Sequence, residues 1–144
     1  MLLRTNREIF QILFEKFLYP FINYGSTPPL TNLDQEYLTQ FHALVEDVTE
    51  DMENYRFHLA SEKLYAYVWH VFADDIIEKS KEIFQNGKEE EKTSTSWLVY
   101  HILITSLAML HPFIPFITEE LWSVLPHQKT KPLLMVEQWP TLTK

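Results

Sequence analysis

The chain has 144 residues, 46% of them hydrophobic and 15% aromatic, which excludes a disordered segment and is enough for one folded domain. Its formal net charge of −8 disfavours a nucleic-acid partner, and its lack of cysteine excludes disulfides and thiolate metal sites. Only two glycines occur and strand-like alternation is scarce, so the composition predicts an all-α fold. No stretch reaches the roughly 18 apolar residues of a membrane span, and the N-terminus does not resemble a signal peptide. A cytoplasmic protein without membrane contact is expected.

The first predicted helix spans positions 6 to 24, where apolar residues recur at steps of three and four. Arg4, Arg7 and Lys16 lie on or near this helix. Pro20 falls inside the pattern, so the helix is expected to kink there or to end early.

A second helix is predicted to begin near Asp34, with an apolar stripe at close to heptad spacing. The stripe consists of Tyr37, Leu38, Phe41, Val45, Val48, Met52 and Tyr55. Between Asp34 and Glu53 there are seven acidic residues and no basic one, which leaves 13 acids against 12 bases elsewhere. The acidity therefore belongs mainly to one helix, and the remaining surface has room for a positive stripe.

The third helix, predicted over positions 58 to 86, is the longest. Its expected core stripe consists of Tyr65, Val68, Trp69, Phe72, Ile76 and Ile83. Gly87 and a charged loop follow, and Thr93 to Ser96 are residues suited to capping the next helix. That fourth helix, predicted over 96 to 110, is apolar on most sides, which indicates that other helices surround it.

Two prolines then interrupt the apolar pattern. Pro112 is expected to end the fourth helix, and Pro115 suits the first turn of a short fifth helix reaching about position 125. Its expected apolar face consists of Ile117, Leu121 and Leu125, with Phe113, Phe116 and Trp122 available to fill the corner. His111 is interpreted as a buried, hydrogen-bonding corner residue.

The predicted architecture is a helical bundle of about five helices: four long antiparallel core helices and a short helix after the proline corner. One domain spans residues 1–144, with its core at about 6–125 and an irregular tail at 126–144. Within the tail, positions 133–136 are expected to form a short extended piece, and Trp139 is a possible anchor.

The residues suggest no catalytic site. The chain lacks a Gly-rich phosphate loop, a Ser elbow and a His-Glu-x-x-His pair. Asp74 and Asp75 are adjacent on a helix and point in different directions, and the six histidines are never at metal-ligand spacing. No catalytic residue and no bound metal are expected.

The available phosphate contacts are Lys79 and Lys81 late in the third helix, Lys88 and Lys92 in the following loop, and Arg4, Arg7 and Lys16 on the first helix. Spacing alone does not show that these groups converge, so ordinary solvated charges remain the alternative. Tyr24, Phe57 and Tyr67 are candidates for stacking on unpaired bases, with core packing the safer interpretation of the last two.

Three segments resemble a known family. LHPFIPFITEELW at 110–122 resembles a motif of the anticodon-binding domain of class I aminoacyl-tRNA synthetases of the valine, isoleucine and leucine group. YRFHLA at 55–60, with LYAYVWH at 64–70 and IEKSK at 77–81, is similar to the long helix of that domain and most like the valyl enzyme. MVEQWP at 135–140 resembles the segment that closes the valyl domain. The chain departs from the pattern at Asp75-Ile76, where the family commonly has Trp-Tyr, and at Ile12-Leu13, where it has Trp-Asn.

The resemblance implies a tRNA-binding module that grips the anticodon stem and loop while the catalytic domain of the parent synthetase, its other expected partner, acts on the acceptor end. Nothing resembles the catalytic signatures of that enzyme, so ATP is expected to bind the parent enzyme and no cofactor is expected on this chain. We expect Arg4, Arg7, Lys16, Lys79 and Lys81 to contact phosphates, and Asn23 and Tyr24 to contact bases.

An alternative of a different class remains open. The chain would then be a structural helical domain that docks against the synthetase body or another protein and has little RNA affinity of its own. The net charge of −8 favours this alternative.

Overall fold

The computed structural model describes residues 26–125 and 132–142, and the predicted first helix at 6–24 lies outside these ranges. The elements are α2 (Asn32–Glu53), α3 (Phe57–Ala66), the π-helix η3 (Tyr67–Ile77), α4 (Glu78–Asn86), α5 (Glu89–Leu110), α6 (Pro115–Val124) and the 3-10 turn η4 (Leu134–Val136). Helices dominate and no strand occurs in the described ranges, which confirms the all-α prediction.

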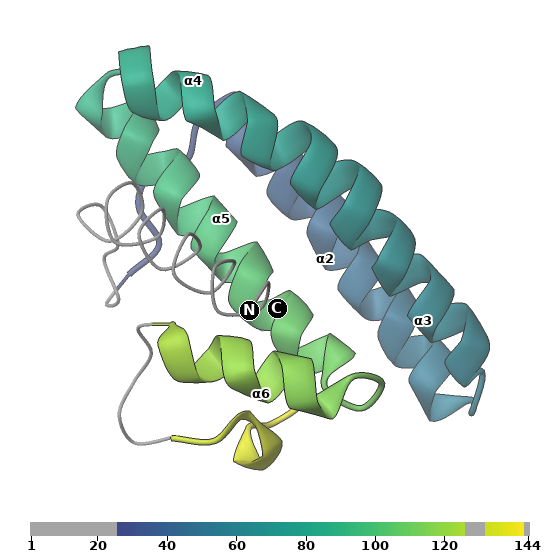
Figure 1. Ribbon diagram of the computed structural model, residues 1–144. Coiled ribbons are helices and arrows are strands. Elements are labelled where there is room, and N and C mark those ends of the chain that lie inside the picture. The colour runs from purple at the N-terminus through teal and green to yellow at the C-terminus, as the bar shows by residue number, and fades with distance from the viewer. Residues whose placement is uncertain (1–25, 126–131, 143–144) are drawn as a thin grey trace.

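Three long helical segments form the bundle (Figure 1). Helix α2 packs antiparallel against the continuous rod of α3, η3 and α4, and α5 packs against both. Helix α6 turns back at the end of α5, and η4 packs beside α6. The three predicted long helices that fall within the described ranges are therefore confirmed, as is the short helix after the prolines.

The π-helix η3 corrects the predicted stripe of the long rod. Tyr67 and Phe72 are both buried although five residues separate them, a step that fits the wider turn of a π-helix and not the 3.6 residues of an α-helix. Tyr65 and Trp69, which were predicted to lie in the core, are instead 64% and 57% exposed. For Trp69 the prediction was wrong because it continued an α-helical period into the π-helix. Tyr65 precedes the π-helix, in α3, where Leu64 is the buried residue instead.

The start of α5 is also corrected. The helix begins at Glu89 and not at position 96, because the carboxylate of Glu91 accepts a hydrogen bond from the backbone N–H of Lys88 at 2.8 Å and caps the first turn. Residues Thr93 to Ser96 are therefore helical. Ser94 Oγ donates to the buried carboxylate of Asp34 at 2.5 Å, and this bond joins α5 to the first turn of α2.

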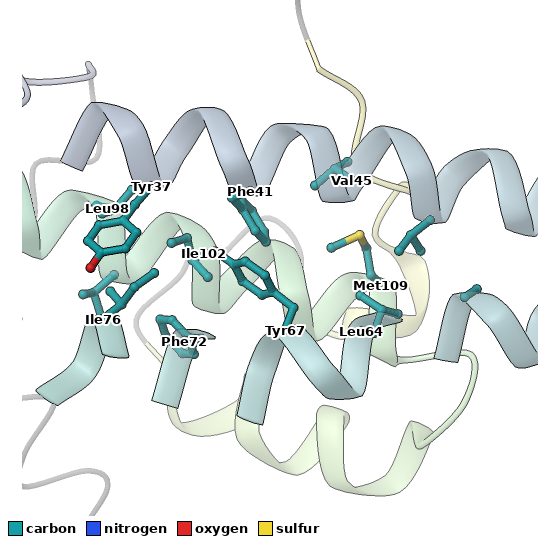
Figure 2. Packing of buried hydrophobic residues seen from close by; sticks show 13 residues of the cluster. Tyr37, Phe41, Val45, Leu64, Tyr67, Phe72, Ile76, Leu98, Ile102 and Met109 are labelled. Atoms are coloured by element: carbon teal, nitrogen blue, oxygen red, sulfur yellow. The ribbon is translucent and has the colours of Figure 1, made fainter. Parts of the chain in front are cut away.

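The main core lies where the three long segments face one another (Figure 2). Phe41 of α2 is fully buried against Tyr67, with ring centroids 5.4 Å apart. Leu64 of α3 and Ile102 of α5 are also fully buried. By composition and length α5 could span a bilayer, but half of its apolar stretch is buried inside the protein, as expected for a core helix.

A second, smaller core joins α6 and the tail to α5. It consists of Leu107, Trp122, Leu125 and Leu134. The burial of Trp122 and Leu125 confirms their predicted roles, whereas Phe116 and Ile117 are 90% and 58% exposed and do not fill the corner. Thr118 takes the inward position instead, because its Oγ1 is hydrogen-bonded to His111 Nδ1 at 2.8 Å and this bond fixes the rotation of α6.

The tail contains a 3-10 turn and not the predicted extended piece. The carboxylate of Glu119 accepts hydrogen bonds from the backbone N–H groups of both Leu134 and Met135, at 2.7 and 3.1 Å. Successive N–H groups point to opposite sides of an extended strand, so one carboxylate holds both only if the chain turns. Trp139 is an anchor, as predicted, since its Nε1 donates to Thr49 Oγ1 of α2 at 2.9 Å.

We predict that Trp122→Ala lowers the free energy of unfolding by about 3–5 kcal/mol, because it removes a buried ring from the small second core. Urea denaturation followed by circular dichroism measures the change. Phe116→Ala is the matched control on the same helix, and as an exposed change it should alter stability by less than about 0.5 kcal/mol. Equal effects of the two substitutions would contradict the packing described here.

Candidate nucleic-acid interface

Lys79, the first described candidate for phosphate contact, is part of a polar cluster at the junction of η3 and α4. Its Nζ lies 2.8 Å from Asp75 Oδ1 and donates to the hydroxyl of Tyr37 at 2.8 Å. Tyr37 in turn donates to Asp75 Oδ2 at 2.6 Å. These partners raise the pKa of Lys79, and Lys79 together with Tyr37 lowers the pKa of Asp75, so both groups are charged at neutral pH.

Lys81, the second described candidate, lies one residue beyond Ser80 on α4. Its Nζ is paired with Glu78 Oε1 at 2.5 Å, and both side chains are exposed. Exposed ion pairs of this kind are worth little and exchange readily with other anions. Positions two apart on a helix face different sides, so the structure does not bring Lys79 and Lys81 together into one phosphate site.

The other predicted contacts, Arg4, Arg7, Lys16, Asn23 and Tyr24, lie outside the described residues. They remain predictions from the sequence.

Arg56 and Lys63 make the most buried ion pairs, and the sequence had not singled them out. Both pair with Asp51, whose side chain is 2% exposed: Arg56 Nε lies 2.7 Å from Oδ1 and Lys63 Nζ 2.6 Å from Oδ2. Lys63 also reaches Asp47 at 2.8 Å. The spacing of Asp47 and Asp51 on one face of α2 was a signal for such a site, but the fold of the α2–α3 hairpin decided which cations would fill it. These two cations join the two helices of the hairpin through Asp51.

Charge is unevenly distributed along the chain. The described ranges contain 18 of the 20 acidic residues but only six of the 12 basic ones. Five of those six cations are within ion-pair distance of a carboxylate, and the sixth is Lys88. The described surface is therefore strongly electronegative, and the remaining six cations belong to segments 1–25, 126–131 and 143–144.

The exposed aromatic side chains differ from those predicted. Tyr67 is buried on Phe41, which confirms its core role, while Phe57 is about half exposed. Tyr65 and Trp69 stack in the open, with centroids 6.3 Å apart and planes 8° from parallel. The sequence pattern missed this pair because it had placed both side chains in the core.

His101 and His111 are largely buried and contact other side chains of the bundle. Burial lowers the pKa of His101 to about 4, with a smaller effect from His42, so this ring is neutral and stacks on Trp97 at 4.9 Å. His111 is mostly buried and hydrogen-bonded at the corner, as predicted. Among the described residues no group of three or more His, Asp or Glu side chains is arranged to hold a metal.

Comparison of the sequence with known proteins identifies the family of the chain. A family model described as the anticodon-binding domain of tRNA ligase matches residues 34–144. This chain belongs to that family. It is 36% identical to a valine–tRNA ligase of Oceanobacillus iheyensis over 136 residues, or 94% of the chain, and 38% identical to one of Thermotoga maritima over 119 residues, or 81% of the chain. A valine–tRNA ligase of Geobacter sulfurreducens is 35% identical over 80% of the chain.

The chain spans only 13% to 15% of the length of these three relatives. The likeness therefore concerns the anticodon-binding domain and not the whole enzyme. Asp75, one of the positions at which the sequence departs from the resemblance described above, is the acid that contacts Tyr37 and Lys79.

We predict that the domain loses stability in acid through Asp51. Lys63 and Arg56 hold the pKa of this carboxyl below its usual value of about 4, so its stabilising effect is complete above that pH and is lost as the pH falls through the lowered pKa. Asp51→Asn should therefore lower the urea midpoint at neutral pH, and the gap from the unsubstituted chain should narrow in acid.

Urea midpoints measured between about pH 7 and pH 3 test this dependence. Glu46→Gln, an exposed change on the same helix, is the control and should leave the midpoint nearly unchanged at every pH. A gap between Asp51→Asn and the unsubstituted chain that stays constant down to the lowest pH would contradict the prediction.

Proposed function

We propose that this chain is the tRNA-binding part of an enzyme of the valine–tRNA ligase type. The observation that carries the proposal is the family match over residues 34–144, together with relatives named valine–tRNA ligase over most of the chain. In this proposal the helical bundle holds the anticodon stem and loop of the tRNA. Binding of ATP and formation of the aminoacyl ester belong to the catalytic domain of the enzyme, and the enzyme works in the cytoplasm.

The charge distribution supports a particular mode of RNA contact. Phosphates are repelled by the electronegative described surface, where five of the six cations already have carboxylate partners. Arg4, Arg7 and Lys16 belong to a segment with few acids, so we expect them to provide most of the phosphate contacts. Asn23 and Tyr24 close that segment and are the proposed base contacts.

Lys79 and Lys81 have a smaller proposed role. Because Lys79 is held by Asp75 and Tyr37, a phosphate has to compete with a preformed carboxylate contact. Lys81 exchanges more easily, since its partner Glu78 is exposed.

Filter-binding titrations with valine tRNA over a range of salt concentrations test whether the N-terminal cations contribute more to binding than Lys79 and Lys81. We expect the affinity for tRNA to fall steeply as the salt concentration rises. Changing Arg4, Arg7 and Lys16 together to Ala should make this dependence weaker: the magnitude of the slope of log K against log salt should decrease by about 0.7–0.9 for each phosphate contact removed. Changing Lys79 and Lys81 to Ala should decrease the magnitude of the slope by at most the amount expected for about one phosphate contact.

The controls keep the charge: Arg4→Lys, Arg7→Lys and Lys16→Arg together, and Lys79→Arg with Lys81→Arg. Both should retain most of the salt dependence, because phosphate attraction depends mainly on charge. Undiminished binding by the triple Ala variant, with its helical spectrum intact, would remove the N-terminal segment from the proposed interface. The same result for Lys79→Ala with Lys81→Ala would remove those two.

The alternative function is a docking domain with little RNA affinity, and the concentration of 18 acids in the described ranges favours it. The same titration separates the two. Absence of measurable tRNA binding at low salt would support the docking role and contradict the first proposal.

A further inference from the structure

Lys79, Asp75 and Tyr37 form a closed ring of polar contacts at the junction of η3 and α4, which we call the Lys79 ring. Lys79 Nζ lies 2.8 Å from Asp75 Oδ1 and donates to the Tyr37 hydroxyl at 2.8 Å. That hydroxyl donates to Asp75 Oδ2 at 2.6 Å. Both carboxylate oxygens and the one proton of the phenol are therefore used inside the ring, and the ammonium keeps a single N–H for another partner.

The acid of the Lys79 ring is held from another helix. Tyr37 belongs to α2, is 7% exposed and is part of the main core. Figure 2 shows it extending from α2 toward the part of η3 that carries Ile76, the residue next to Asp75. Because the core fixes the Tyr37 side chain, its hydroxyl keeps the Asp75 carboxylate in place even when Lys79 moves away.

The ring faces solvent, yet its charges cancel. The side chains of Lys79 and Asp75 are 53% and 42% exposed, so a phosphate can approach them. Lys79 and Tyr37 lower the pKa of Asp75, so its carboxylate is negatively charged at neutral pH. A phosphate is attracted by the ammonium and repelled by the carboxylate at nearly the same distance. It gains little at Lys79 unless the contact between Lys79 and Asp75 opens.

The pair formed by Lys81 and Glu78 provides a comparison on the same helix. It also joins a lysine to an acid one turn earlier, and both side chains are exposed. Within the described ranges, however, neither member has a hydrogen bond to another helix. Glu78 is therefore free to move away when Lys81 meets an anion, whereas Asp75 is not.

We propose that Asp75 is an intramolecular competitor that withholds Lys79 from the phosphates of tRNA. Lys79 binds phosphate only after the Lys79 ring opens, and the carboxylate that Tyr37 holds in place favours its closing again. This inference rests on the proposed function, in which Lys79 is a phosphate contact. It assigns to an acid, and not to the lysine, the control of RNA affinity at this junction.

The first test measures filter binding of valine tRNA to the 144-residue chain with Asp75→Asn. Asn has nearly the same size and can still accept the Tyr37 hydroxyl, but it has no charge. We expect binding at low salt to become about two- to fivefold tighter, the factor that corresponds to an exposed ion pair. The magnitude of the slope of log K against log salt should increase by about 0.7–0.9, as for one additional phosphate contact.

Glu78→Gln is the matched control, because it removes the same charge from an ion pair of the same helix. It should tighten binding by less than about twofold, since that pair already exchanges readily. In a chain with Lys79→Ala, adding Asp75→Asn should give no such gain, because the acid then has no lysine to withhold. Equal gains from Asp75→Asn and Glu78→Gln, or a gain that persists without Lys79, would overturn the inference.

A second readout needs no tRNA. Inorganic phosphate is titrated into the chain at constant ionic strength, and NMR follows the Cε resonances of Lys79 and Lys81. The response of Lys79 should be about two- to fivefold larger with Asp75→Asn than without it, and that of Lys81 should be unchanged. An equal response of Lys79 in both chains would overturn the inference. Circular dichroism checks the fold, and Asp75→Ala repeats both measurements if Asp75→Asn alters the helical spectrum.

The two readouts separate this inference from the proposed function. A chain that does not bind tRNA, but whose Lys79 responds to phosphate as expected, would contradict the RNA-binding role and leave the competition by Asp75 standing. Binding of tRNA that Asp75→Asn does not change would contradict the competition and leave the RNA-binding role standing.

Discussion

The π-helical segment in the middle of the long rod is the constraint on which the core depends. Between Tyr67 and Phe72 the inward-facing register advances by five residues, and this step lets Tyr67 meet Phe41 while Phe72 still faces the core. The same step leaves Trp69 on the outside. Near the end of the segment, Asp75 reaches across to Tyr37 of α2, so the register of η3 also sets how the two arms of the hairpin are joined.

The proline corner has two faces that the sequence motif does not separate. Trp122 and Thr118 face inward and close the second core, whereas Phe116 and Ile117, in the same motif, face solvent. Packing accounts for the first pair only.

The described bundle is acidic, and five of its six described cations are already paired with carboxylates, which limits how it can bind RNA phosphates. Arg56 and Lys63 serve the hairpin by neutralising Asp51. Most of the proposed phosphate contacts, Arg4, Arg7 and Lys16, therefore belong to the N-terminal segment, and Lys79 and Lys81 have the smaller proposed role. This proposed arrangement reconciles a net charge of −8 with membership of a tRNA ligase family.

The sequence by itself determined the all-α class, the long helices after position 26, the corner at Pro112 and Pro115, and the family, because apolar periodicity, proline geometry and motif residues are local properties. The site residues proposed from the sequence remain predictions, five of them outside the described ranges. Only the tertiary structure decided which side chains are buried around η3 and that Phe116 is exposed. Burial around η3 depends on a change of helical period, and the inward position of Thr118 is accompanied by its bond to His111. The composition and the spacing of residues do not specify either feature. The start of α5 depends on a local cap from Glu91 that the sequence analysis missed.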